Sequence, residues 1–250
     1  MDSAERYLAS VRRALDDICF EQVEQAAGVI AEALRNDGII HVFGSGHSSL
    51  LAQEVFFRAG GLVAVNAILD ARLGFERGAV ESTEFERRVD SADLLIHRES
   101  FRTNDAGVVI SNSGRNPLPI EIAVRMNASG MKVIALTNLT QSRQSKSHHP
   151  SGKRLFEIAH VILDNHCPCG DAAITIEGVP AALGPLSTIA GAALLHSTFL
   201  RAVEVLAREG QSPDVFVTVN MGSLMLDDLK QLLARYQNRI RYYRPGGKAD

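Results

Sequence analysis

The order of apolar and polar positions predicts a helical N-terminal segment, followed by a sheet in which strands and helices alternate. Residues 3–35 carry apolar side chains three and four positions apart, which is the period of an amphipathic helix. The pattern stops at residues 36–38, Asn-Asp-Gly, a sequence that commonly ends helices. An amphipathic helix needs a surface for its apolar stripe, so we expect this segment to pack on the rest of the chain or on a second copy of it.

After Gly38, two units with the same order of elements follow one another. Each has a short apolar strand, a loop rich in glycine and hydroxyl groups, a helix, a glycine and a second strand. The first unit has a strand at 39–43, the first loop at 44–49, a helix at 50–59 and a strand at 62–65. The second has a strand at 108–110, the second loop at 111–116, a helix at 118–128 and a strand at 132–136. Such units predict an α/β fold with a mainly parallel sheet and helices on both faces.

The rest of the chain adds shorter or less regular elements. Residues 66–106 contain two helix-like pieces, at 82–89 and 92–99. Further on we expect strands at 160–163, 173–176 and 215–219, helices at 187–208 and 227–239, and a tail from 244 to 250. Residues 178–200 carry no charge and are long enough to cross a membrane. Because they include two prolines and several hydroxyl groups, we expect a loop leading into a buried helix.

The two loops are the strongest candidates for ligand binding. Each lies between a strand and a helix N-terminus, where unpaired N–H groups and the helix dipole attract anions. The glycines permit tight turns, and the serines add neutral hydroxyl donors. Two such loops at the carboxyl edge of one parallel sheet predict a site for a phosphate on a small organic molecule. The candidates are Gly44, Ser45, Gly46, His47, Ser48 and Ser49, with Ser111, Asn112, Ser113, Gly114, Arg115 and Asn116.

Composition and charge exclude several other classes of partner. The net charge is −3, without the basic excess that nucleic-acid binding requires, and there is no tryptophan for base stacking. We therefore expect neither nucleic acid nor membrane as a partner. A dinucleotide site is disfavoured because the first loop reads G-x-G-x-x-S and the next strand ends at Asn66 rather than at an acid; no P-loop sequence is present. The three cysteines and a start without an apolar signal region predict a cytoplasmic protein.

The chain resembles the SIS (sugar isomerase) domain family through four short motifs in order. They are Gly44-Ser-Gly-His-Ser48, Ser111-Asn-Ser-Gly114, Thr137-Asn138 and Pro185-Leu-Ser-Thr188. The longer patterns SNSGRNPLPIEIA, HPSGKRLFEIA, DNHCPCGDA and GPLSTIAGAALLH resemble compact SIS proteins described only as phosphosugar-binding. The resemblance implies a three-layer α/β/α sandwich in which Ser and Thr positions hold a sugar phosphate, which adds Thr137, Ser187 and Thr188 to the candidates. It also implies a homodimer or homotetramer, with residues 1–36 as a helical segment and 37–250 as the SIS domain.

Within this family the implied activity is aldose–ketose isomerisation, which needs a base to move a proton between adjacent carbons. Among the acids and histidines, we favour His47 in the first loop, Glu84 in the irregular segment and Glu177 at a predicted strand end. The other candidates are Glu54, Glu81, Asp164, Asp171 and His196. Two alternatives stay open: a non-catalytic sensor of sugar phosphates, and a lyase of the N-acetylmuramate-6-phosphate etherase type.

We expect no metal and no other cofactor. Phosphoheptose isomerases look related and carry a metal-binding His and Glu on their first helix, but the like positions here are Glu54 and Arg58. His148-His149 is too close in sequence to converge on one ion, and the spacing in His166-Cys-Pro-Cys169 is too tight for a usual zinc site. The basic stretch 140–154 is either a solvated loop or a mobile lid that carries positive charge toward the phosphate.

Overall fold

A computed structural model describes residues 1–217 and 226–244 of the chain. Its centre is a five-stranded, wholly parallel sheet with the order β2-β1-β3-β4-β5. The strands are β1 (Ile40–Gly44), β2 (Val65–Ala67), β3 (Ala106–Ile110), β4 (Lys132–Thr137) and β5 (Val161–Asp164). In register, Val42 of β1 lies between Ala67 of β2 and Val108 of β3. The predicted α/β class with a parallel sheet is confirmed.

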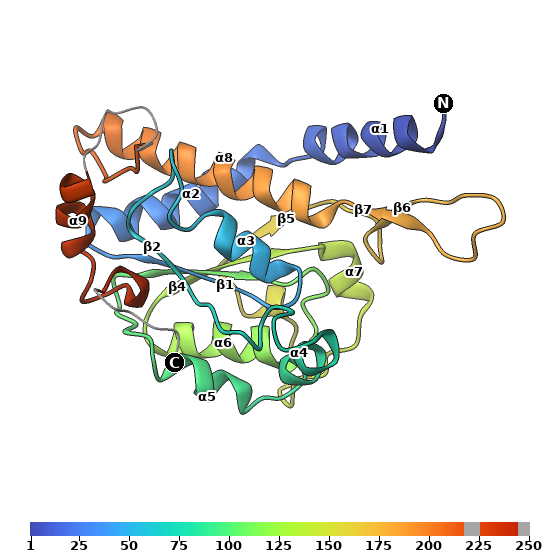
Figure 1. Cartoon of the computed structure of the whole chain (residues 1–250), viewed down its shortest axis with the longest axis horizontal. Helices are drawn as coiled ribbons and strands as arrows, with labels where there is room; N and C mark the ends of the chain where they lie inside the picture. The colour runs from blue at the N-terminus through green and yellow to red at the C-terminus, as the bar shows by residue number, and fades with distance from the viewer. Residues whose placement is uncertain (218–225, 245–250) are drawn as a thin grey trace.

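Helices cover both faces of the sheet (Figure 1). One face carries α2 (Phe20–Arg35), α3 (Ser48–Glu54) and α8 (Ser187–Arg208), and the other carries α4 (Ala79–Glu86), α5 (Ser91–Ile96) and α6 (Pro117–Ala128). Two separate apolar clusters follow from this. Val108 and Ile110 of β3 pack into the α2–α8 cluster, whereas Val109 packs into the α6 cluster, as the alternation of side chains along a strand requires.

Helix α8 matches the range predicted for it, and its apolar side packs against α2 and α3. Among the residues that the structure describes, α8 is the one helix whose length and composition would also suit a membrane span. Leu194 and Leu195 are buried in the cluster that α8 shares with α2. The expected buried helix is therefore present in the core.

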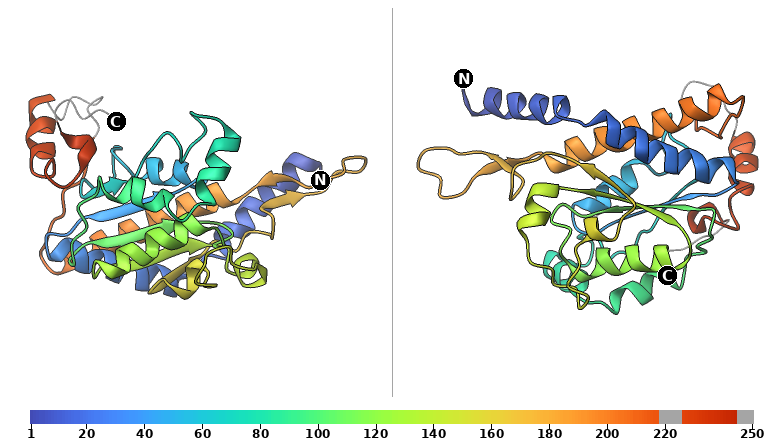
Figure 2. Two further views of the ribbon diagram at one scale, coloured as in Figure 1. Left: turned by 90° about the horizontal axis from the view of Figure 1, so that it is seen from below. Right: turned by 180° about the vertical axis from the view of Figure 1, so that it is seen from behind.

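The N-terminal segment is two helices rather than one. α1 (Ser3–Asp16) ends at its cap Asp17, and α2 begins after Cys19, whose backbone is extended. α1 projects from the body beside an antiparallel arm formed by β6 (Ala172–Ile174) and β7 (Leu183–Pro185), as two further views show (Figure 2). The Tyr7 hydroxyl donates to the Pro185 carbonyl at 2.8 Å, so α1 and the arm are joined.

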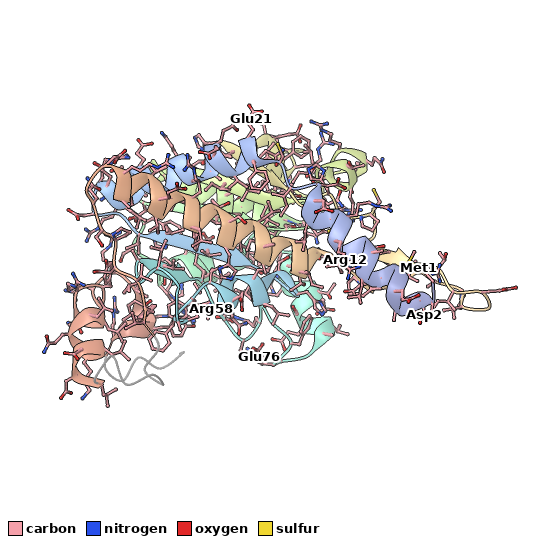
Figure 3. The ribbon with its side chains drawn as sticks, turned by 90° about the horizontal axis from the view of Figure 1, so that it is seen from above. Met1, Asp2, Arg12, Glu21, Arg58 and Glu76 are labelled. Atoms are coloured by element: carbon pink, nitrogen blue, oxygen red, sulfur yellow. The ribbon has the colours of Figure 1, made fainter. Side chains whose placement is uncertain are left out.

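Met1 and Asp2 lie at the far end of the projecting helix α1 (Figure 3). Ala14 is its one buried residue, and Leu8 is 52% exposed. Within one copy of the chain, most of the predicted apolar stripe of α1 therefore has no full cover.

Several other boundaries differ from those predicted. α3 stops at Glu54 rather than near 59, and β2 starts at Val65 because Leu62 instead forms an antiparallel bridge with Val215. α4 and α5 fall close to the two helix-like pieces. Helix α7 (Leu139–Gln144), strand β7 and the short 3-10 helices η1 (Leu155–Glu157) and η3 (Arg241–Tyr243) were not expected.

The C-terminal elements pack near the amino edge of the sheet. The last α-helix, α9 (Leu226–Ala234), is shorter than predicted. Beyond it, Arg239 donates to both carboxylate oxygens of Asp105 at 2.7 Å. The predicted strand 215–219 and the tail 244–250 lie partly outside the described residues.

Candidate phosphate-binding crevice

The two loops meet at the point where the sheet changes its winding direction. β1 leads into α3 on one face, and its neighbour β3 leads into α6 on the other. The connections after these strands therefore diverge, and a crevice opens between them at the carboxyl edge. The structure brings the first and second loops together here, with the N-terminus of α8 beside them.

The second loop presents a group of unpaired backbone donors. Gly114 adopts φ +58°, and its N–H donates to the Ser111 hydroxyl oxygen at 3.2 Å. The Asn112 carbonyl accepts from the Asn138 N–H at 3.0 Å, which fixes the loop to the end of β4. The N–H groups at positions 113, 115 and 116 have no hydrogen-bond partner in the part of the chain that the structure describes. Free N–H groups close together in a turn can form a concave site for an anion, although here the Gly114 N–H between them is bound to Ser111.

Helix α6 adds little to this set of donors. Its first and third residues are Pro117 and Pro119, which lack an N–H, and the Asn116 side chain makes no capping bond. The donors of the second loop therefore come from the loop itself, while α6 contributes its dipole. Thr137 is fully buried, and its hydroxyl donates to the Asn112 carbonyl at 3.2 Å. This hydrogen bond helps to fix the second loop to the end of β4.

In the first loop, most of the residues predicted to bind a ligand instead stabilise the turn itself. A Cβ at Gly44 would lie 2.3 Å from the Ser48 carbonyl oxygen, so only glycine fits there. Gly46 has φ +56°, and the Ser49 hydroxyl donates to its carbonyl at 2.7 Å. Ser45 and Ser49 are buried. Ser48 is the one serine of this loop that lines a narrow cleft between the two loops.

A narrow cleft joins the loops to β5 and α8. It has room for about one water molecule, so a sugar requires the loops to separate or lies over the opening. Asn165 was missed by sequence reasoning, although it directly follows β5 and lies two residues after the strand predicted at 160–163. Its amide donates to the Asn112 side-chain oxygen at 2.8 Å. The residues lining the cleft are Ser48, Leu51, Ile110, Asn112, Leu136, Asn165, Ser187 and Thr188.

None of the favoured acid–base residues lines this cleft. His47 is exposed in the first loop, with its ring 4.9 Å from that of Phe75. Glu84 is exposed on α4. Glu177 is exposed between β6 and β7, in the segment that Figure 1 shows at the end of the arm. Within one copy of the chain, the structure does not bring these three together.

A different acid–histidine pair bridges α3 and α8. His196 Nε2 lies 3.1 Å from Glu54 Oε1, and Arg58 forms an ion pair with the same carboxylate. Burial, and then the positive charge of Arg58, lower the pKa of His196. Glu54 and His196 were both among the less favoured candidates from the sequence.

The basic stretch 140–154 is fastened to the second loop. The Arg115 carbonyl accepts from the His148 N–H at 2.9 Å, and the Gly114 carbonyl accepts from the Leu155 N–H at 2.8 Å. His149, whose side chain is 8% exposed, pairs with Glu121 of α6 at 3.0 Å. These contacts hold the stretch against the candidate site and add His148 beside the Arg115 guanidinium.

The described residues contain no group of three or more His, Cys, Asp or Glu side chains that could hold a metal. His148 and His149 face different partners, Arg115 and Glu121. We therefore predict that dialysis against EDTA leaves ligand affinity and any isomerase activity unchanged. Calorimetry and a coupled assay before and after dialysis measure this; one equivalent of zinc per chain in elemental analysis would contradict it.

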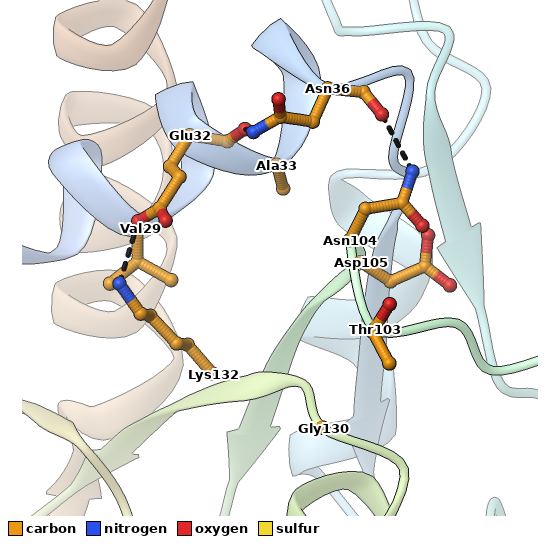
Figure 4. A pocket seen from close by; sticks show the side chains of 9 residues that line it. All are labelled: Val29, Glu32, Ala33, Asn36, Thr103, Asn104, Asp105, Gly130 and Lys132. Carbon is orange, nitrogen blue, oxygen red and sulfur yellow. Dashed lines mark hydrogen bonds and ion pairs between the residues drawn. The ribbon is translucent and has the colours of Figure 1, made fainter.

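A second pocket lies at the opposite, amino edge of the sheet (Figure 4). Its one cation, Lys132, pairs with Glu32 at 2.7 Å, and the Asn104 amide donates to the Asn36 carbonyl at 2.6 Å. Asp105 in the same wall is a buried carboxylate. This pocket is larger than the cleft, but its lysine and both of its asparagine amides are paired and its wall carries the carboxylates of Glu32 and Asp105, so it suits a phosphate poorly.

Comparison with known proteins gives matches over most of the chain. A family model described as the SIS domain matches residues 6–138. A UPF0309 protein of Halalkalibacterium halodurans is 42% identical over 219 residues, covering 87% of each chain. A UPF0309 protein of Geobacillus thermodenitrificans is 38% identical over 220 residues, covering 88% of each.

Two solved structures are similar to this chain over most of its length. Phosphoheptose isomerase from Neisseria gonorrhoeae has a TM-score of 0.47 and 19% identity, over 80% of this chain and 94% of that one. The Vibrio vulnificus NanR protein, complexed with ManNAc-6P, has a TM-score of 0.47 and 19% identity, over 83% of this chain and 62% of that one.

Proposed function

The chain belongs to the SIS domain family, and we propose that it binds a phosphorylated sugar or amino sugar in the crevice between its first and second loops. The observation that carries the proposal is the set of unpaired N–H groups at positions 113, 115 and 116 of the second loop. The same loop carries the Ser113 hydroxyl, for which no partner is present in the described chain, and the Arg115 side chain. A phosphate dianion offers the acceptors that such a set requires.

Neutral donors dominate this site, which favours a small phosphorylated molecule over a polyanion. Arg115 is the one fixed charge in the two loops, and its guanidinium already contacts His148. A hydrogen bond to a charged acceptor is worth about 1.5–3 kcal/mol, so a few of them account for micromolar binding of a monophosphate. Ser48 on the opposite side of the crevice supplies a further hydroxyl.

Replacement of Ser113 by alanine tests this assignment. We expect sugar-phosphate affinity to fall about tenfold or more, because one hydrogen bond to a charged acceptor is lost. The melting temperature should stay nearly unchanged, since the hydroxyl has no partner within the described chain. Isothermal calorimetry measures the change. Unaltered affinity would remove Ser113 from the site.

As the reaction we propose aldose–ketose isomerisation, with His47 of the first loop as the candidate base. The competing proposal is a non-catalytic sensor, and it is favoured by one observation: no residue lining the cleft titrates near neutral pH. Incubation with sugar phosphates in deuterated water separates the two. Deuterium at C1 or C2 of the recovered sugar supports isomerisation, release of a substituent indicates a lyase, and binding without either indicates a sensor.

We further propose that the protein acts in the cytoplasm as a homodimer or homotetramer. Its cysteines are free, which suits a reducing compartment. Apolar side chains are exposed on the projecting helix α1, at Leu8, and on two helices of one face of the sheet, at Phe20 of α2 and Leu200 of α8. A second copy packed over this face would cover them, and would also cover the Glu54–His196 pair that lies between α3 and α8.

A further inference from the structure

Asp171 occupies the N-terminus of α8 from within the chain. Its Oδ1 accepts from the N–H of Leu186 at 3.0 Å and from the N–H of Ser187 at 2.7 Å. Its Oδ2 accepts from the Ser187 hydroxyl at 2.6 Å. The Asp171 backbone has φ +66°, which is uncommon for a residue with a side chain. Two N–H groups at the start of α8, those of Leu186 and Ser187, and the Ser187 hydroxyl are therefore already bound to a carboxylate.

This arrangement sets the hydrogen-bonding role of Ser187. A carboxylate only accepts hydrogen bonds, so the Ser187 hydroxyl hydrogen points to Asp171 and the oxygen lone pairs remain for other partners. Ser187 also lines the cleft. Toward a ligand it therefore acts as an acceptor, whereas the second loop at the other side of the crevice presents free N–H donors.

The charges around the N-terminus of α8 are also negative, as expected for an end of the crevice that accepts hydrogen bonds. Burial, followed by the negative charges of Asp171 and Asp164, raises the pKa of the Cys167 thiol to about 12. None of the residues lining the cleft is a lysine or arginine that could balance these carboxylates. The end of the crevice beside α8 is thus negative and rich in acceptors.

We propose that Asp171, acting through Ser187, selects sugar phosphates whose end opposite the phosphate carries hydroxyl or ammonium groups, and excludes ligands with a second anionic group there. The inference rests on the proposed function, because it places the phosphate in the second loop. A hydroxyl or ammonium group donates to the Ser187 oxygen and is favoured by the nearby carboxylate. A second phosphate meets the like charge of Asp171, and the Ser187 hydroxyl is not free to donate to it.

Calorimetry with matched ligands tests the role of Asp171. A panel of aldose and ketose monophosphates first identifies one that binds the wild-type chain; its bisphosphate is then compared with it. In the wild type we expect the bisphosphate to bind at least about tenfold more weakly than the monophosphate. In Asp171→Asn this penalty should fall below about threefold, because the charge is gone and the Ser187 hydroxyl can turn toward the ligand. The ratio is taken within each variant, so a loss of stability does not affect it.

Two further variants sharpen the result. Asp93→Asn removes the same charge on α5, where Asp93 pairs with Arg125 at 3.1 Å, and should keep the wild-type ratio. Ser187→Ala should weaken the monophosphate but retain the bisphosphate penalty, since Asp171 keeps its charge. A wild type without a penalty, or an unchanged penalty in Asp171→Asn, would overturn the role of Asp171 alone. Failure of every monophosphate to bind would overturn the proposed function, and this inference with it.

Discussion

Replacing Gly114 by alanine should reduce sugar-phosphate affinity by about thirtyfold or more, or roughly 2 kcal/mol. Gly114 adopts φ +58°, a conformation that costs an alanine about 1 kcal/mol. The added Cβ would lie 2.7 Å from the Ser142 hydroxyl oxygen and 3.2 Å from that of Thr137. Both neighbours are buried. The second loop would have to move, and its free N–H groups would no longer converge on the phosphate. Calorimetry with a bound monophosphate measures the loss.

A second-site change separates displacement of the loop from general instability. The Ser142 hydroxyl is buried and has no hydrogen-bond partner among the described residues, so Ser142→Ala should leave affinity nearly unchanged. Combined with Gly114→Ala it removes the nearest clash and should restore much of the affinity, which a double-mutant cycle quantifies. Gly210→Ala shares the positive φ, at +77°, but its Cβ meets nothing within 4 Å, and affinity should not change. A Gly114→Ala chain with wild-type affinity would remove the second loop from the site.

Deletion of residues 1–18 should convert the assembly to monomers and weaken ligand binding at the same time. Helix α1 buries only Ala14 in its own chain, while Leu8 remains 52% exposed. Each such apolar side chain contributes about 1.5–3 kcal/mol when a partner fully covers it, before the entropy of ordering is subtracted. Light scattering coupled to size exclusion measures the mass. A full-length chain that is monomeric at micromolar concentration would contradict this account of α1.

A point variant tests the same surface without removing the contacts of α1 to the arm. Leu8→Glu should dissociate the assembly, whereas in an isolated chain an exposed glutamate at this position would cost little. Leu94→Glu is the matched control, because Leu94 is also partly exposed but lies on α5, across the sheet from α8. If Leu8→Glu keeps the assembly and Leu94→Glu loses it, the interface lies instead on the face of the sheet that carries α5.

The strand pattern could be predicted from the sequence because the sheet is covered on both faces. β3 and β4 are short apolar runs bounded by polar loops, and such runs stand out in any window. The break between α1 and α2 could not be predicted in the same way. Residues 17–19 include neither glycine nor proline, and the apolar period continues through Ile18, which packs on the core cluster of α2.

The two loops of the candidate site could also be predicted, because each directly follows a strand. Once the two strands are neighbours in a parallel sheet, the loops must lie at the same edge. Asn165 and Asp171 were harder, because their positions depend on the path from β5 through the arm to α8. Ser142 carried no signal at all; its proximity to Gly114 arises from the unexpected helix α7. The roles of His47, Glu84 and Glu177 stay predictions, because they depend on the ligand and on a second copy of the chain.

The most direct test of phosphate binding in the second loop is a titration of the ¹⁵N-labelled protein with sugar monophosphates, followed by amide chemical shifts. We expect saturable binding of at least one monophosphate, with the largest shifts at the amides of Ser113, Arg115 and Asn116, whose N–H groups are free. Residues of the amino-edge pocket, such as Asn104 and Lys132, should not respond. Shifts confined to that pocket, or no saturable response to any monophosphate, would contradict the account.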